Sequence, residues 1–143
     1  MILSVAPVSA GELVVALGGS ELSPDDAERA GIAEIGWRFE PLGTTDLRPT
    51  VGISAHFAGV AFAGAGVAAR RALSGPWFAE AVVSAGILAD RRDGASDTEA
   101  ALRGSVAVGR QVTDDLGIAL GVSRIRSDDI RLDAVTLRLH MDF

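Results

Sequence analysis

The stretch that decides the fold is DAVTLRLHMDF (residues 133–143), the last eleven residues of the chain. One alternate set of its side chains is apolar: Val135, Leu137, Leu139, Met141 and Phe143. The other set is small or polar: Ala134, Thr136, Arg138, His140 and Asp142. Because successive side chains of a β-strand point to opposite faces, this alternation predicts a strand with one apolar and one polar face.

Most of the remaining chain has the same two-residue period, which predicts an all-β fold. The expected strands cover 12–19, 31–40, 47–57, 60–71, 77–88, 98–110, 115–125 and 133–143. In the second strand, for example, Ile35 and Trp37 oppose Glu34 and Arg38. The fourth and fifth strands have Ala and Gly on both faces, so their facing stays open.

A strand with one apolar face suits either a soluble sandwich or a membrane barrel, and three features favour the barrel. The strands have the length of a tilted membrane span, about ten residues. Long polar connections at 20–30 and 89–97 alternate with tight turns at 41–46, 72–76 and 111–114. The chain also ends on an alternating strand with an aromatic residue. We therefore predict a closed, eight-stranded antiparallel transmembrane β-barrel of the bacterial outer membrane, without sheet edges.

The amino-acid composition excludes several classes of protein and of binding site. The chain has 143 residues, 48% of them hydrophobic, but no apolar run approaches the roughly 20 residues of a membrane helix. It has no cysteine, which excludes disulfides and thiolate metal sites, and its two histidines are far apart. All 13 basic residues are arginine and the net charge is −6, without a basic patch for nucleic acid. We expect one domain, 11–143, with no metal and no cofactor.

The first ten residues, MILSVAPVSA, are typical of the end of a signal peptide, with cleavage before Gly11. The alternative is an ordinary apolar first strand. Export would place the N- and C-termini in the periplasm and direct 20–30, 57–60, 89–97 and 126–132 outward. Trp37 and Trp77 then flank periplasmic turns, where an interfacial aromatic belt is expected.

The inward faces of the expected strands carry many charged residues. A barrel of eight strands fills its interior with side chains, so we expect a network of paired charges and no open channel. The candidate members are Glu34, Arg38, Glu40, Arg48, His56, Glu80, Arg103, Arg138 and His140.

Several segments, in this order, resemble the lipid A deacylase family of outer-membrane barrels, the acyloxyacyl-hydrolase-like proteins. They are GELVVALGGSELSPDD (11–26), LRPTVGIS (47–54), AFAGAGVA (61–68), WFAEAVVSAGIL (77–88), RGSVAVGR (103–110) and the terminal strand. The resemblance covers 11–143. It implies a barrel whose relatives hydrolyse an ester-linked acyl chain of lipid A.

The family motif is a His-x-Ser pair near the outer end of the seventh strand, with a Glu on the last strand. Arg124 stands here at the histidine position, Arg126 at the serine position and Asp133 at the glutamate position. A guanidinium remains protonated and cannot act as a general base. Neighbouring Ser123 and Ser127 have no histidine close in sequence. The resemblance therefore implies a pseudoenzyme, with no intact catalytic residues.

We expect Arg124, Arg126 and Arg131 to face outward at the barrel rim, with Asp133 pairing with one of them. Guanidinium groups bind phosphate in bidentate fashion, so a lipid A phosphate of the outer leaflet is the expected ligand. Three alternatives remain open. The arginines could be tolerated at the interface without a ligand, the chain could be an esterase with rearranged residues, or loops 20–30 and 89–97 could meet an envelope partner.

Overall fold

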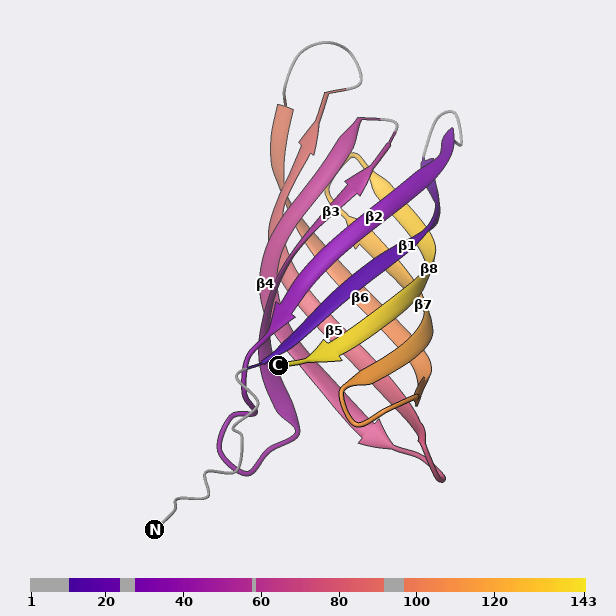
Figure 1. Ribbon diagram of the computed structural model, residues 1–143. Helices are drawn as coiled ribbons and strands as arrows, with labels where there is room; N and C mark the ends of the chain where they lie inside the picture. The colour runs from indigo at the N-terminus through magenta and orange to yellow at the C-terminus, as the bar shows by residue number, and fades with distance from the viewer. Residues whose placement is uncertain (1–10, 24–27, 58, 92–96) are drawn as a thin grey trace.

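The computed structural model describes residues 11–23, 28–57, 59–91 and 97–143 as a single closed β-barrel (Figure 1). The eight strands are β1 (Glu12–Ser23), β2 (Glu28–Arg38), β3 (Leu47–His56), β4 (Val60–Ala72), β5 (Trp77–Asp90), β6 (Asp97–Gln111), β7 (Leu116–Arg126) and β8 (Arg131–Asp142). Each strand is antiparallel to the next, and β8 pairs with β1. The predicted eight-stranded antiparallel barrel is confirmed.

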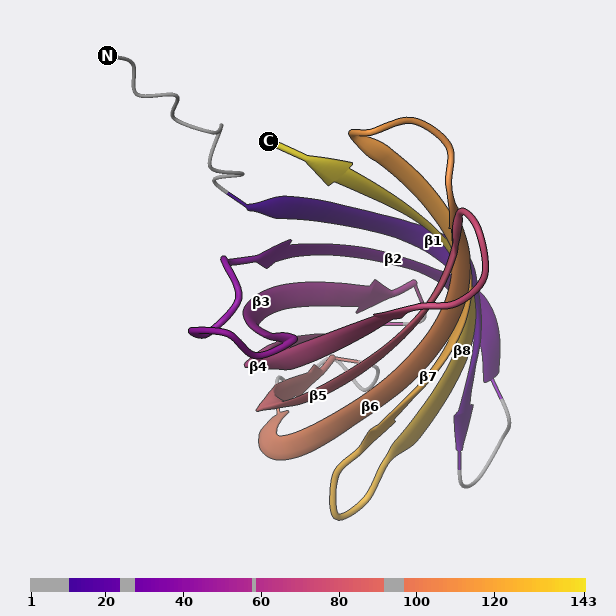
Figure 2. The same cartoon turned by 90° about the horizontal axis from the view of Figure 1, so that it is seen from below.

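The first and last strands close the barrel. Their ladder runs from Glu12 opposite Asp142 to Ser23 opposite Arg131, and the two strands lie side by side near the chain ends (Figures 1 and 2). The amide N–H of Phe143 donates to the carbonyl of Gly11 over 3.0 Å. Closure therefore pairs the strand that carries the terminal aromatic residue along its whole length.

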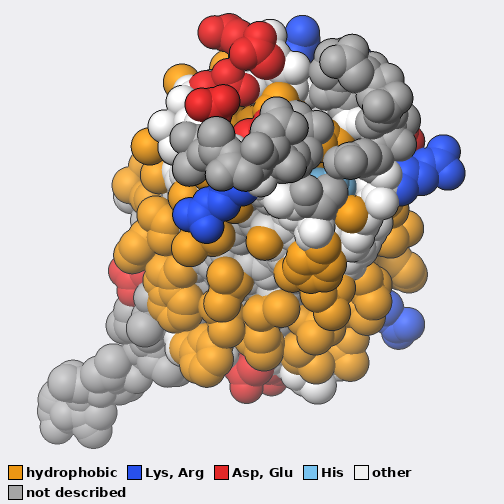
Figure 3. Space-filling view, turned by 90° about the horizontal axis from the view of Figure 1, so that it is seen from above, with side chains coloured by type: hydrophobic (Ala, Val, Ile, Leu, Met, Phe, Trp, Pro, Cys, Tyr) orange, Lys and Arg blue, Asp and Glu red, His pale blue; other side chains and the backbone are white. Residues whose placement is uncertain are grey.

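The outer wall of the barrel is apolar. Outward side chains such as Leu17 (62% exposed), Val83 (61%) and Leu137 (52%) expose more than half of their surface. Figure 3 shows hydrophobic side chains over much of the visible wall. Such a band matches the lipid-facing surface of membrane barrels. The described residues contain no helix with the length and hydropathy needed to cross a membrane.

Inward side chains fill the lumen. The structure also shows which residues of β4 and β5 face inward, a point that the sequence left open. Phe62 of β4 and Phe78 of β5 point inward, whereas alanines such as Ala63 and Ala85 point outward. Ten apolar residues pack together in the half of the lumen away from the termini: Leu22, Ile32, Val60, Phe62, Leu88, Ala101, Ile125, Ile130, Leu132 and Ala134. We call this group the apolar plug. Its members lie in or next to the ends of the strands that are at the top of Figure 1.

The prediction of a long external loop at 20–30 is wrong for most of that segment. β1 continues to Ser23 and β2 begins at Glu28, and Ser20 pairs with Ala30 in the ladder. The polar composition of this segment led to the prediction of a loop, although its side chains alternate as in a strand. Leu22 faces inward, is only 1% exposed and belongs to the apolar plug.

Two other predicted connections are also shorter than expected. The strands β7 and β8 reduce the expected 126–132 connection to 127–130. β5 and β6 likewise extend into the expected loop at 89–97, of which 92–96 lie outside the described residues, as do 24–27. The proposed signal-peptide remnant, 1–10, also lies outside them.

Candidate functional site

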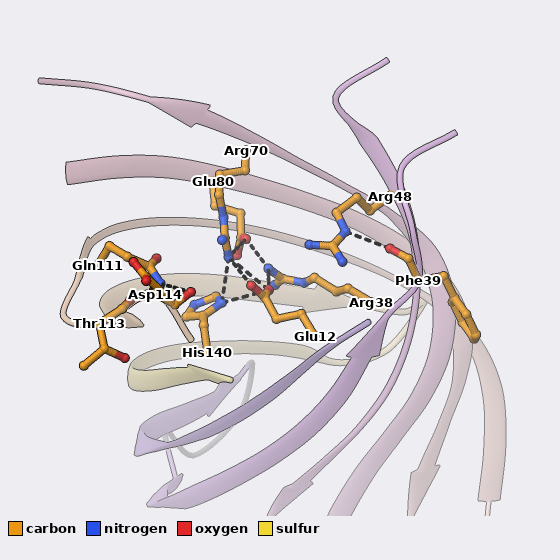
Figure 4. A network of polar contacts seen from close by, with 10 residues as sticks. All are labelled: Glu12, Arg38, Phe39, Arg48, Arg70, Glu80, Gln111, Thr113, Asp114 and His140. Atoms are coloured by element: carbon orange, nitrogen blue, oxygen red, sulfur yellow. Dashed lines mark hydrogen bonds and ion pairs between the residues drawn. The ribbon is translucent and has the colours of Figure 1, made fainter. Parts of the chain in front are cut away.

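Five buried or half-buried side chains form an ion-pair network inside the barrel, close to the two termini (Figure 4). Its members are Glu12, Arg38, Arg70, Glu80 and His140, which we call the lumenal network. Arg38 Nη1 lies 3.1 Å from Glu12 Oε1 and is also paired with Glu80. Arg70 Nη2 lies 2.8 Å from Glu12 Oε2 and 3.2 Å from Glu80 Oε2. Two guanidinium groups thus neutralise two carboxylates in a largely buried site.

The network also contains an imidazole. His140 Nδ1 lies 3.1 Å from Glu12 Oε1, and the ring of Phe78 stacks edge-on against it with centroids 5.6 Å apart. The guanidinium of Arg70 lies over the same Phe78 ring, 4.4 Å from its centroid. Aromatic packing therefore holds the polar groups in place from one side.

The predicted lumenal residues divide into three groups. Arg38, Glu80 and His140 join the lumenal network, and Glu34 pairs with Arg103 higher in the barrel. Arg138 is buried and donates to Thr136 Oγ1, and His56 is hydrogen-bonded to Ser20. The prediction for Glu40 is wrong, because Glu40 is exposed beyond the end of β2. Arg48 is half-buried on the inward-facing side of β3, and its Nε donates to the Phe39 carbonyl.

The sequence analysis did not identify Glu12 and Arg70 as members of the network. Arg70 and Glu80 face each other across the tight turn between β4 and β5, so their pairing follows from counting outward from that turn. Glu12 is different, because its partners Arg38, Arg70 and His140 come from three other strands. No feature of the sequence around Glu12 predicts that these residues meet.

Glu12, Glu80 and His140 are also a donor set that could hold a metal ion, with ligand atoms within 4.8 Å of one another. Carboxylate and imidazole suit several divalent metals. Both carboxylates already accept from Arg38 or Arg70, and a cation would have to displace these positive groups. The arrangement fits a compensated ion-pair network better than a metal centre.

The second charged group lies on the outer wall, where β7 meets β8. Arg124, Arg126 and Arg131 are exposed, and we call them the outer arginine cluster. Asp133 is directly opposite Arg124 in the ladder and accepts from its Nε over 2.7 Å and from its Nη2 over 3.3 Å. Arg131 Nε lies 3.6 Å from the second oxygen of the same carboxylate.

Arg126 is the least compensated member of this cluster. It is directly opposite Arg131 in the β7–β8 ladder, with both side chains outward. Among the described residues it forms no ion pair within 4.0 Å. Like charges directly opposite on one face of a sheet repel each other. Asp128 and Asp129 are in the adjoining turn and are the nearest acids in sequence.

Two serines close to this cluster in sequence, Ser123 and Ser127, have other surroundings than the arginines. Ser123 is buried and faces the lumen, and Ser127 Oγ donates to Glu99 Oε1 over 2.5 Å. Both histidines are buried inside the barrel. Among the described residues, the outer wall therefore has arginines and one carboxylate at the positions of the expected triad, without a histidine.

Comparison with known proteins extends the description of the fold. No family model and no curated protein matches the sequence. Solved structures do match: the Neisserial surface protein A (TM-score 0.77, 12% identity) covers 94% of this chain and 98% of its own. The attachment invasion locus protein Ail of Yersinia pestis (TM-score 0.54, 13% identity) covers 93% and 99%. The N-terminal barrel of Pseudomonas aeruginosa OprF (TM-score 0.58, 9% identity) also covers 93% and 99%. The chain thus has the fold of the small eight-stranded outer-membrane barrels.

Proposed function

We propose that this chain is an outer-membrane barrel, with both termini in the periplasm, that binds the phosphate groups of lipid A through the outer arginine cluster. The observation that carries the proposal is the outward pair Arg126 and Arg131, placed opposite each other by the β7–β8 register. A phosphate between two guanidinium groups replaces their repulsion with charge-assisted hydrogen bonds.

The position of the cluster supports this ligand. Arg126 is the last residue of β7 and Arg131 the first of β8, at the end of the barrel away from the termini. Charged residues on a lipid-facing wall cost about 2–4 kcal/mol at the midplane but only about 0–1 near the interface. In the proposed orientation the arginines lie at the level of lipid headgroups, which they reach by snorkelling.

We further propose that the chain is a degenerate relative of the lipid A deacylases that its segments resemble. Arg124 and Arg126 at the family positions supply neither a general base nor a nucleophile. Mass spectrometry of lipid A after incubation with the folded protein should show every ester-linked acyl chain retained. Release of a chain would overturn this part of the proposal and make Ser127, bonded to Glu99, the first residue to replace.

Binding is tested by the double variant Arg126→Ala/Arg131→Ala in a titration with purified lipid A, followed by native mass spectrometry. Hydrogen bonds to charged groups contribute about 1.5–3 kcal/mol each, so we expect affinity to fall by at least about tenfold. Arg71→Ala is the matched control, because Arg71 is exposed near the opposite end of the barrel. Equal affinity of the double variant and the control would refute the proposal.

A second candidate is recognition of a free anionic glycan by the external end of the barrel. It is favoured by the structure of Ail in complex with the heparin analogue sucrose octasulfate (TM-score 0.53, 12% identity). The same arginines would then meet an envelope or host partner. Displacement of lipid A by sucrose octasulfate would show that both ligands use the cluster, whereas tight binding of the glycan alone would favour this candidate.

A further inference from the structure

Cross-strand rows of outward side chains run across the barrel wall because the strands are paired in register. One row contains the outer site: Val83, Gly104, Arg124, Asp133, Glu21 and Arg29. The next row contains Ala81, Val106, Val122, Val135, Gly19 and Gly31. Between the two rows lies a depression of about 1090 Å³, which we call the outer groove.

Two glycines open the outer groove. A Cβ atom built on Gly104 or Gly19 would have no heavy atom within 4 Å. Gly31 differs, because the ring of Phe57 lies 2.9 Å from the position of its missing Cβ and covers it. The wall is therefore bare backbone at two points, and one of them, Gly104, is directly opposite Arg124 in the β6–β7 ladder.

The rest of the groove is lined largely by apolar side chains. Val83, Val106, Val122 and Val135 are all exposed along it. The charged residues stand in one row only, on the side that carries Arg124 and Asp133. A ligand that matches this surface has an anionic group at the arginines and an apolar chain beside it.

We infer that the outer groove holds an acyl chain of the phosphorylated lipid whose headgroup binds the outer arginine cluster, with Gly104 and Gly19 providing the space for the chain. This inference rests on the proposed function. A free glycan, sulfated or phosphorylated, would engage the arginines but would leave the groove empty.

The test fills the groove and leaves every arginine of the cluster in place. Gly104→Leu/Gly19→Leu adds apolar side chains at positions where the backbone leaves room, and Gly104→Val is a milder version. Ala65→Leu is the control, because it adds a leucine to the exposed wall on β4, outside the groove. Tryptophan fluorescence and heat-modifiable gel migration verify that each variant folds.

Each variant is titrated with two probes, purified lipid A and its fully deacylated, phosphorylated disaccharide. We expect the double glycine variant to bind lipid A about tenfold more weakly than Ala65→Leu, because several methylene groups lose their contact with the protein. It should bind the deacylated disaccharide as well as the parent protein does. Gly104→Val should give an intermediate loss for lipid A.

The two proposals fail in different ways. If the glycine variants bind lipid A like Ala65→Leu while Arg126→Ala/Arg131→Ala loses both probes, the groove is not the acyl site and the headgroup proposal stands. If the arginine variant keeps both probes, the proposed function itself is overturned, and the groove inference with it.

Discussion

The barrel carries two groups of arginines with opposite surroundings. Arg38 and Arg70 in the lumen each pair with both Glu12 and Glu80. On the outer wall, Arg124 and Arg131 share a single carboxylate, and Arg126 has no ion-pair partner among the described residues. The two carboxylates of the lumenal network balance its two arginines, whereas one carboxylate serves the three arginines of the outer cluster.

This difference follows from desolvation. The guanidinium groups of Arg38 and Arg70 have lost most of their water, and the carboxylates of Glu12 and Glu80 replace it. An arginine at a membrane interface keeps access to water and to headgroups, so its charge needs no partner from the protein. This difference supports the proposal that the outer arginine cluster binds a ligand, and it predicts that the lumenal network stabilises the fold.

The largest expected effect comes from breaking the lumenal network. Glu80→Ala leaves Arg38 and Arg70 with one carboxylate between them, and removing one partner of a buried pair costs about 3–5 kcal/mol. Urea unfolding of the barrel in lipid vesicles, followed by tryptophan fluorescence, measures the loss. Glu40→Ala, at the exposed position wrongly expected in the lumen, should unfold like the parent. Equal stability of both variants would mean that the network does not stabilise the fold.

A smaller effect is expected from Gly121→Val. A Cβ at Gly121 would lie 2.6 Å from Cζ of Arg138, which packs against the bare backbone there. Overpacking of this kind costs about 1–3 kcal/mol. The contrasting variant is Gly104→Val on the outer wall, where the added side chain meets open space. Parallel urea curves should separate the two, and a greater loss for Gly104→Val would contradict the distinction between lumen and wall.

The smallest effect on stability, but a measurable one on binding, is expected from Asp133→Asn. This carboxylate is exposed and competes with a phosphate for Arg124. The urea midpoint should stay unchanged, because exposed ion pairs contribute little. Affinity for lipid A should rise about threefold as the local negative charge disappears. Asp114→Asn, at the opposite end, should change neither quantity, and a fall in affinity for Asp133→Asn would show that Asp133 is needed to orient Arg124.

Much of the fold was predictable because strand alternation is a local property. The facing of Arg124, Arg126 and Asp133 followed from counting along β7 and β8. The inward facing of His56 and His140 followed in the same way from β3 and β8. The extent of β1 and β2 was not predictable, because Ser20 and Glu21 have the composition of a loop. Cross-strand pairing with Ala30 and Arg29 stabilises them as strand.

The sequence alone determined the two-residue period, and with it the strand content and the division between an apolar and a polar face. It also placed arginines at the two positions where the family resemblance predicts a catalytic pair. Only the tertiary structure decided which charges meet, because closure and register join residues as distant as Glu12 and His140. For the same reason, the pairing of Arg126 with Arg131 is visible only in the ladder between β7 and β8. The outer groove likewise exists only in the folded barrel, because its two rows of residues come from six strands.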